Sequence, residues 1–241
     1  MIKTIKIENA VFWFLVSAAV ISAVLFLFLS DDLQLSAVLT PTGTDMPVLV
    51  IDAGHGGEDG GAVSLSGVHE SEINLDISKK MAALSGLTGI KYAMTRDSEN
   101  IVYPEGLKTT SKRKKYDQQR RVDFVNGTDN AVLISVHQNC YPHKSPHGPQ
   151  SFYSKAEGSS PLAVLIQDSL NAVISPGNRR ISMPVAENIY LFKSVKCPAV
   201  LVECGFISNP EESEKLDTEA YRLKIATVLI SSYLRYMDTK E

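Results

Sequence analysis

Three short apolar segments rich in β-branched residues constrain the fold of this chain most strongly. They are Val48–Ile51, Ala131–Val136 and Ala199–Val202, and each is long enough for one strand. A continuous apolar run is typical of a strand that is buried on both faces, as in a parallel sheet covered by helices. Weaker strand signals lie at Ile90–Thr95, Phe152–Tyr153 and Ile189–Phe192.

Helical patterns alternate with these strands. Apolar residues recur at helical spacing from Ile73 to Leu84, from Leu162 to Val173 and from Tyr221 to Ser232, and a further helix is expected to end at Asn126. Such alternation predicts an α/β domain with a mostly parallel sheet of about six strands, flanked by helices. A single domain over residues 47–238 is of ordinary size for one hydrophobic core.

The beginning of the chain does not fit this pattern. Residues 10–29 are apolar and uncharged, two lysines precede them, and Asp31 and Asp32 follow. At about 1.5 Å per residue this stretch spans the roughly 30 Å hydrocarbon core of a bilayer. We therefore expect a transmembrane helix within residues 1–30, a linker over residues 31–46, and the globular domain outside the cytoplasmic membrane. A cleavable signal peptide, which would leave the domain secreted, is the alternative.

Four of the expected strand ends and helix starts carry a side chain suited to metal binding or acid–base chemistry. His55 follows the first strand in a glycine-rich turn, and Glu70 stands where the next helix begins. His137 and Glu203 directly follow the apolar runs Ala131–Val136 and Ala199–Val202. Because the carboxyl ends of parallel strands lie along one edge of a sheet, we expect these four residues to form one site.

The composition of this set predicts a zinc centre. Two histidines and one carboxylate, with a fourth position open to water, recur in catalytic zinc sites. We predict that His55, Glu70 and His137 bind Zn²⁺ and that Glu203 takes a proton from water. Taken singly, the first three have plainer explanations: a phosphate-binding turn, a carboxylate at a helix start and a hydrogen-bonded core residue. Burial of Glu203 without a partner would be costly, so it is the least ambiguous of the four.

The remaining polar features predict no second site. His69 is expected to face solvent or to support the site, and His143 and His147, in a proline-rich loop, are not expected to bind metal. The three cysteines are an odd number without metal-ligand spacing, which favours buried or inert thiols. The net charge of −3 argues against a nucleic-acid partner.

The four segments also carry a family resemblance. In order they read Gly54-His-Gly-Gly, Glu70-Ser-Glu-Ile-Asn-Leu, Ser135-Val-His-Gln-Asn and Val202-Glu-Cys-Gly-Phe-Ile-Ser-Asn-Pro. This order resembles the zinc-dependent N-acetylmuramoyl-L-alanine amidases of bacterial cell-wall turnover, over nearly the whole of residues 47–237. The resemblance implies that the two histidines and Glu70 bind zinc and that Glu203 is the catalytic carboxylate. It further implies hydrolysis of the amide between the lactyl group of N-acetylmuramic acid and the first L-alanine of the stem peptide.

Two other functions stay open at this point. A zinc peptidase that cuts within the stem peptide would use the same metal chemistry. A non-catalytic module that binds glycan or activates another enzyme would need no metal-water base, so the presence of all four site residues disfavours it.

A basic segment, Tyr103–Asp117, separates this chain from the shortest family members. Its cations are Lys108, Lys112, Arg113, Lys114 and Lys115. We expect either a solvated loop or a docking surface for an acidic partner or anionic glycan peptides. The cluster is away in sequence from every proposed zinc ligand, and zinc coordination does not need it.

With the anchor and the compact size, this segment makes the chain similar to the sporulation-specific amidases. Those enzymes strip peptides from cortex muramic acid, which a separate deacetylase then converts to muramic-δ-lactam. The resemblance implies peptidoglycan strands with stem peptides as substrate, a functional link to a deacetylase, and, as in some clostridial relatives, a lipoprotein activator.

Overall fold

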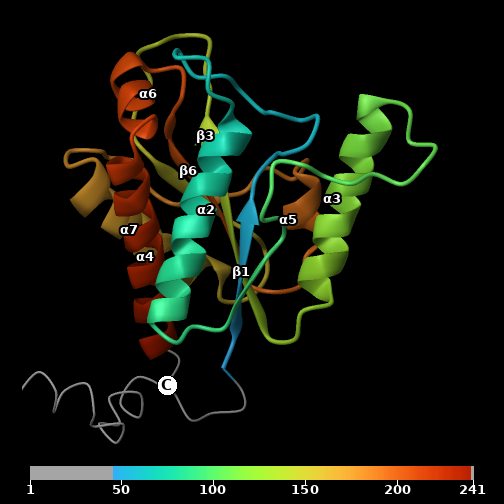
Figure 1. Cartoon of the computed structure of the whole chain (residues 1–241). Helices are drawn as coiled ribbons and strands as arrows, with labels where there is room; N and C mark the ends of the chain where they lie inside the picture. The colour runs from blue at the N-terminus through green and yellow to red at the C-terminus, as the bar shows by residue number, and fades with distance from the viewer. Residues whose placement is uncertain (1–45, 240–241) are drawn as a thin grey trace, which may run out of the picture. The chain divides into compact units, whose positions relative to one another are not determined.

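A computed structural model describes residues 46–239, which form one six-stranded sheet with helices on both faces (Figure 1). The strand order is β2-β1-β3-β6-β4-β5. The expected transmembrane helix and nearly all of the linker lie outside the described residues. Within residues 46–239, no helix is both long and apolar enough to cross a bilayer. The strands are β1 (Val48–Ala53), β2 (Tyr92–Met94), β3 (Ala131–Asn139), β4 (Gln150–Tyr153), β5 (Met183–Pro184) and β6 (Ala199–Phe206).

The centre of the sheet is parallel. β1 pairs in parallel with both β2 and β3, and β3 pairs in parallel with β6. β4 runs antiparallel to β6, and the short β5 completes the sheet in parallel with β4. The prediction of a mostly parallel sheet of about six strands flanked by helices is confirmed.

The helices form two layers. α2 (Glu70–Leu87), α4 (Ser159–Ser169) and α7 (Glu219–Asp238) cover one face, while α3 (Thr110–Asn126) and α5 (Tyr190–Ser194) cover the other (Figure 1). A π-helical turn, Leu170–Ile174, extends α4, and α6 (Pro210–Leu216) follows β6.

The apolar strand runs are explained by these two layers. Leu49 and Ile51 of β1 belong to the core shared with α2, α4 and α7, whereas Val50 between them belongs to the core shared with α3 and α5. All three are fully buried. Successive side chains of a strand point to opposite faces, so a strand covered on both sides is apolar throughout.

One predicted strand is wrong. Residues 189–192 do not form a strand; Tyr190–Ser194 is the short helix α5, and its Leu191 and Phe192 are buried in the core shared with α3. The sixth strand is instead Met183–Pro184, whose two residues are exposed. A short apolar run fits a buried helix turn as well as a strand, and two exposed residues carry no periodic signal.

The basic segment is a loop only as far as Thr109. α3 already begins at Thr110, where the Thr109 side chain accepts a hydrogen bond from the Lys112 backbone N–H at 3.4 Å. A threonine cap of this kind satisfies one of the free N–H groups of a helix start. Lys112, Arg113, Lys114 and Lys115 therefore stand on the first turns of a helix.

Candidate metal centre

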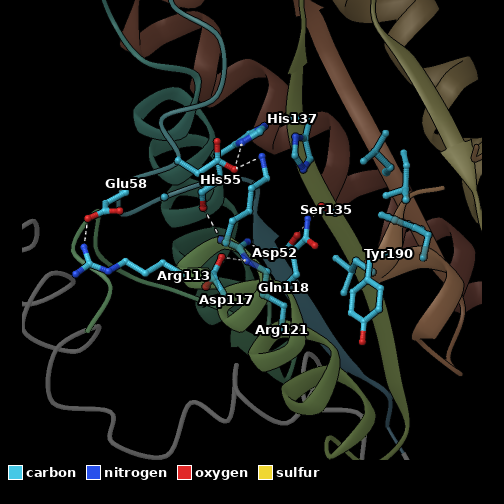
Figure 2. A pocket seen from close by; sticks show the side chains of 18 of the residues that line it. Asp52, His55, Glu58, Arg113, Asp117, Gln118, Arg121, Ser135, His137 and Tyr190 are labelled. Atoms are coloured by element: carbon cyan, nitrogen blue, oxygen red, sulfur yellow. Dashed lines mark hydrogen bonds and ion pairs between the residues drawn. The ribbon is translucent and has the colours of Figure 1, made fainter. Parts of the chain in front are cut away.

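The four predicted site residues meet at the carboxyl edge of the central strands. His55 follows β1 and Glu70 is the first residue of α2. On β3, His137 lies directly beside Glu203 of β6 in the strand register. Figure 2 shows His55 and His137 close together among the residues that line a pocket. The predicted convergence of residues from distant parts of the sequence is confirmed.

One carboxylate oxygen lies between the two imidazole rings. Oε1 of Glu70 is 3.1 Å from Nδ1 of His137 and 3.3 Å from Nε2 of His55. One ligand atom from each of these residues lies within 4.8 Å of the other two. The ring centroids are 4.9 Å apart, with the rings edge to face. Two imidazoles and a carboxylate at these separations form a group that can hold one metal ion.

The turn after β1 requires glycine because the backbone passes against a ring. A Cβ on Gly54 would lie 2.2 Å from Nε2 of His137, which no side chain permits. His55 itself has a φ of 60°, a left-handed conformation that is uncommon for residues other than glycine. This turn is held by Arg96, which donates hydrogen bonds to the carbonyls of Ala53 at 2.9 Å and Gly54 at 3.0 Å.

Glu70 is fixed from several directions. Only 4% of this residue is exposed. Its Oε2 accepts a hydrogen bond from the Ala62 N–H at 3.0 Å, and its Oε1 accepts one from the Gln138 N–H at 3.0 Å. These bonds fix the position of the carboxylate. Burial would raise the pKa of Glu70, but hydrogen bonds and charge interactions with His137 and His55 outweigh burial and hold the pKa well below the usual range.

Asn74 supports the site, although the sequence analysis assigned it no role. It is fully buried one helical turn after Glu70 and donates a hydrogen bond to the Gly54 carbonyl at 3.2 Å. Its Oδ1 accepts a hydrogen bond from the side chain of Gln138 at 3.0 Å. An asparagine on the apolar face of a predicted helix, four residues after a candidate ligand, was a signal that could have identified it.

A buried ion pair lies beneath the metal centre. Arg121 of α3 donates to Asp52 of β1 at 2.5 Å and to the Ala53 carbonyl at 2.7 Å, and it also hydrogen bonds to the His55 carbonyl (Figure 2). Burial would raise the pKa of Asp52, but Arg121 and hydrogen bonds from Ser135 and Thr95 lower it to about 2. Arg121 therefore ties α3 to the turn that carries His55.

Glu203 has the properties of a proton acceptor. Its Oε2 is buried and has no hydrogen-bond partner among the described residues. Burial raises the pKa of Glu203 to about 7, with an opposing contribution from His137. The site opens into a cavity of about 340 Å³ lined by residues of α3 and α5, including Gln118, Tyr190 and Leu191. A carboxyl group with this pKa exchanges protons readily near neutral pH.

In the metal-free protein, thermal stability is expected to fall as the pH rises from about 5 to about 9. Burial would lower the pKa of His55, but hydrogen bonds to Asp59 and Glu70 outweigh it and raise the pKa to about 9. The stabilising contribution of His55 is thus complete below pH 6.5 and is lost as the pH rises through 9. The raised pKa of Glu203 destabilises the fold increasingly between pH 4.5 and about 7.

Melting curves at about pH 5 and about pH 9, with and without Zn²⁺, measure this loss of stability. An unchanged melting temperature without metal would contradict it.

The other histidines and the cysteines lie outside the cluster. His69, His143 and His147 are exposed, and His69 occupies the N-cap position of α2. Among the described residues, the three cysteines are free thiols: Cys204 is buried, Cys197 is half-buried and Cys140 is exposed. Within residues 46–239, the group that could hold a metal ion consists of His55, Glu70 and His137.

Comparison with known proteins decides the family. The family model described as N-acetylmuramoyl-L-alanine amidase matches residues 49–232. The chain belongs to this family. It is therefore a hydrolase that acts on the amide between N-acetylmuramic acid and L-alanine in peptidoglycan, as the resemblance of the four segments implied.

Individual amidases support this membership over most of the chain. A germination-specific N-acetylmuramoyl-L-alanine amidase of Bacillus subtilis is 34% identical over 194 residues, which are 80% of this chain and 81% of that protein. The amidase LytC of the same organism is 29% identical, but the match spans only 35% of its length.

Solved structures show the same fold. The CwlD amidase from Clostridioides difficile, in complex with the GerS lipoprotein, superposes with a TM-score of 0.76 at 32% identity and covers 80% of this chain and 99% of that chain. A second amidase, from Clostridium difficile 630, gives a TM-score of 0.70 at 26% identity and covers 82% of this chain and 100% of that chain.

Proposed function

We propose that this amidase is zinc-dependent, with His55, Glu70 and His137 as the metal ligands and Glu203 as the general base. One observation carries the proposal. The three candidate ligands converge at one strand edge, and Glu203 lies next to His137 in register with no hydrogen-bond partner for its buried Oε2 within residues 46–239.

The residues fit a zinc ion by their chemistry. Neutral imidazole nitrogens and a carboxylate oxygen are ligands that zinc accepts, and three protein ligands leave a position for water. The unsatisfied oxygen of Glu203 would find a partner in a water molecule at that position. When bound, zinc supplies Lewis acidity that polarises the scissile carbonyl and makes the water more acidic.

In the proposed reaction, Glu203 transfers the proton from the attacking water to the leaving nitrogen. Glu203 accepts a proton from the attacking water, and its buried, otherwise unpaired Oε2 is available for this within residues 46–239. It then donates this proton to the alanine nitrogen as the carbon–nitrogen bond breaks. Glu70 stays in place because its carboxylate accepts hydrogen bonds from the Ala62 and Gln138 N–H groups. The products are an intact stem peptide with a free amino terminus and an unsubstituted muramic acid.

The biological setting that we propose is the spore cortex. It is supported by similarity to the germination-specific amidase and by the N-terminal apolar stretch, residues 10–29, which would anchor the catalytic domain outside the cytoplasmic membrane. The product would then feed a deacetylase on the route to muramic-δ-lactam. A lipoprotein partner is part of the proposal because the related CwlD amidase has been solved with the GerS lipoprotein.

Digestion of purified cortex peptidoglycan is expected to release whole stem peptides that begin with L-alanine. The glycan should retain muramic acid with a free lactyl carboxyl group, because the metal and Glu203 act only on the muramoyl amide. Mass spectrometry of both fractions measures this outcome, with the Glu203→Gln variant as the control. Release of single amino acids or truncated peptides would indicate a stem-peptide peptidase instead, and absence of any product would favour a binding module.

A further inference from the structure

The basic start of α3 lies directly on the glycine-rich turn that carries His55. Arg113 forms an ion pair with Glu58 of this turn (Figure 2), and the Thr110 hydroxyl donates to the same carboxylate at 3.3 Å. Tyr103 lies beneath the Arg113 guanidinium, 5.3 Å from it, and its hydroxyl would be 2.3 Å from a Cβ on Gly57. This segment, although far in sequence from His55, is packed against the turn that carries it.

A second ion pair reaches the metal centre itself. Nζ of Lys114 is 2.7 Å from Oδ2 of Asp59, and the same oxygen is 3.1 Å from Nδ1 of His55. The other ring nitrogen of His55, Nε2, is the one that lies 3.3 Å from Glu70. A continuous series of contacts therefore runs from Lys114, on the exposed start of α3, through Asp59 to Nδ1 of the His55 ring.

The carboxylate of Asp59 can decide which nitrogen of His55 faces the metal. A metal-bound histidine commonly donates its second ring N–H to a carboxylate, which fixes the tautomer and the ring orientation. Arg96 and Arg121 hold the backbone of this turn, but they bond to its carbonyl groups and do not determine which ring nitrogen of His55 faces Glu70. An external partner for its Nδ1 is needed to keep Nε2 directed at Glu70.

We propose that Asp59 and Lys114 are positioning residues for the metal site. Asp59 accepts the Nδ1–H of His55, which leaves the Nε2 lone pair for the metal, and Lys114 holds Asp59 in place for this contact. The inference rests on the proposed function, in which His55 is a zinc ligand. It reassigns one residue of the basic segment from docking to the metal centre; the exposed Lys112 and Lys115 make no ion pair among the described residues, and docking stays a prediction for them.

Zinc affinity measures this role directly. Purified full-length protein is stripped of metal, and Zn²⁺ binding is titrated in competition with a chromogenic chelator. Asp59→Asn should weaken binding by about 10-fold to 100-fold, the range observed for partners of metal-bound histidines. Lys114→Met should weaken it towards the lower end of that range, and Lys114→Arg should restore it. Lys115→Met, which removes the same charge one position further along α3, is the matched control and should bind zinc like the wild type.

Folding defects are separated from positioning by two further readouts. Side-chain exposure is 49% for Lys114 and 27% for Asp59, and a pair this exposed contributes little to folding stability, so melting of the metal-free Lys114→Met variant should be unchanged. In the zinc-loaded wild type, ¹⁵N NMR of the histidine rings should show His55 protonated on Nδ1. Protonation on Nε2 would overturn the proposal, since Nδ1 would then be bound to metal and could not donate to Asp59.

The outcomes also distinguish this inference from the proposed function. If His55→Ala binds zinc as tightly as the wild type, the ligand assignment fails, and the positioning role fails with it. If His55→Ala loses zinc while Asp59→Asn and Lys114→Met both keep wild-type affinity, the ligand assignment stands and only the positioning role is overturned.

Discussion

Removal of metal by a chelator is expected to reduce peptidoglycan hydrolysis to background, and added Zn²⁺ should restore it. His137→Ala should cause the same loss without rescue, because it removes one of the three ligand atoms and leaves Oε1 of Glu70 without one of its two imidazole neighbours. The measurements are the rate of stem-peptide release and the zinc content by elemental analysis.

The matched control for this variant is His143→Ala. His143 is an exposed histidine outside the metal cluster, so its removal should change neither zinc content nor rate. Full activity in a preparation shown to be free of metal would exclude a metal-dependent mechanism for this chain. Retention of bound zinc by His137→Ala would remove that residue from the ligand set.

Glu203→Gln is expected to lower kcat by about 10²-fold to 10⁴-fold, the usual contribution of a general base. Glutamine keeps the shape of the side chain but cannot accept the proton of the attacking water. Because the candidate ligands are three other residues, zinc content should remain close to that of the wild type. Kinetic assays on soluble peptidoglycan fragments, paired with elemental analysis, separate the two quantities.

The control carboxylate is Glu211 on α6. It is exposed and pairs with Lys215 at 2.6 Å, so Glu211→Gln should leave kcat unchanged. A near-normal rate in Glu203→Gln would mean that another group takes the proton. Loss of zinc in that variant would instead assign Glu203 to metal binding.

The central strands could be predicted from the sequence, because each one is a continuous apolar run that is buried on both faces. The runs Val48–Ile51, Ala131–Val136 and Ala199–Val202 are central strands because each of their faces meets a helix layer. The convergence of His55 and His137 followed from the same prediction, since parallel strands place their carboxyl ends together. These inferences needed only periodicity and topology.

The supporting contacts of the site could not be predicted in this way. Lys114 and Arg121 of α3 pair with Asp59 and Asp52, and nothing in the residues around these two cations indicates which carboxylates they will reach. Charged residues on a predicted helix are usually solvated, so pairing over such sequence distances is visible only in three dimensions. The helix at Tyr190–Ser194 was missed for a related reason, because its burial depends on a contact with α3.

The placement of the base on β6 has a consequence for how the site is assembled. His55, Glu70 and His137 are all supplied by the chain before residue 138, whereas Glu203 arrives only with β6, which must insert between β3 and β4. A chain without β6 would carry all three candidate ligands and still lack Glu203. The candidate ligands and the candidate proton acceptor therefore stand together only in a sheet that has β6 between β3 and β4.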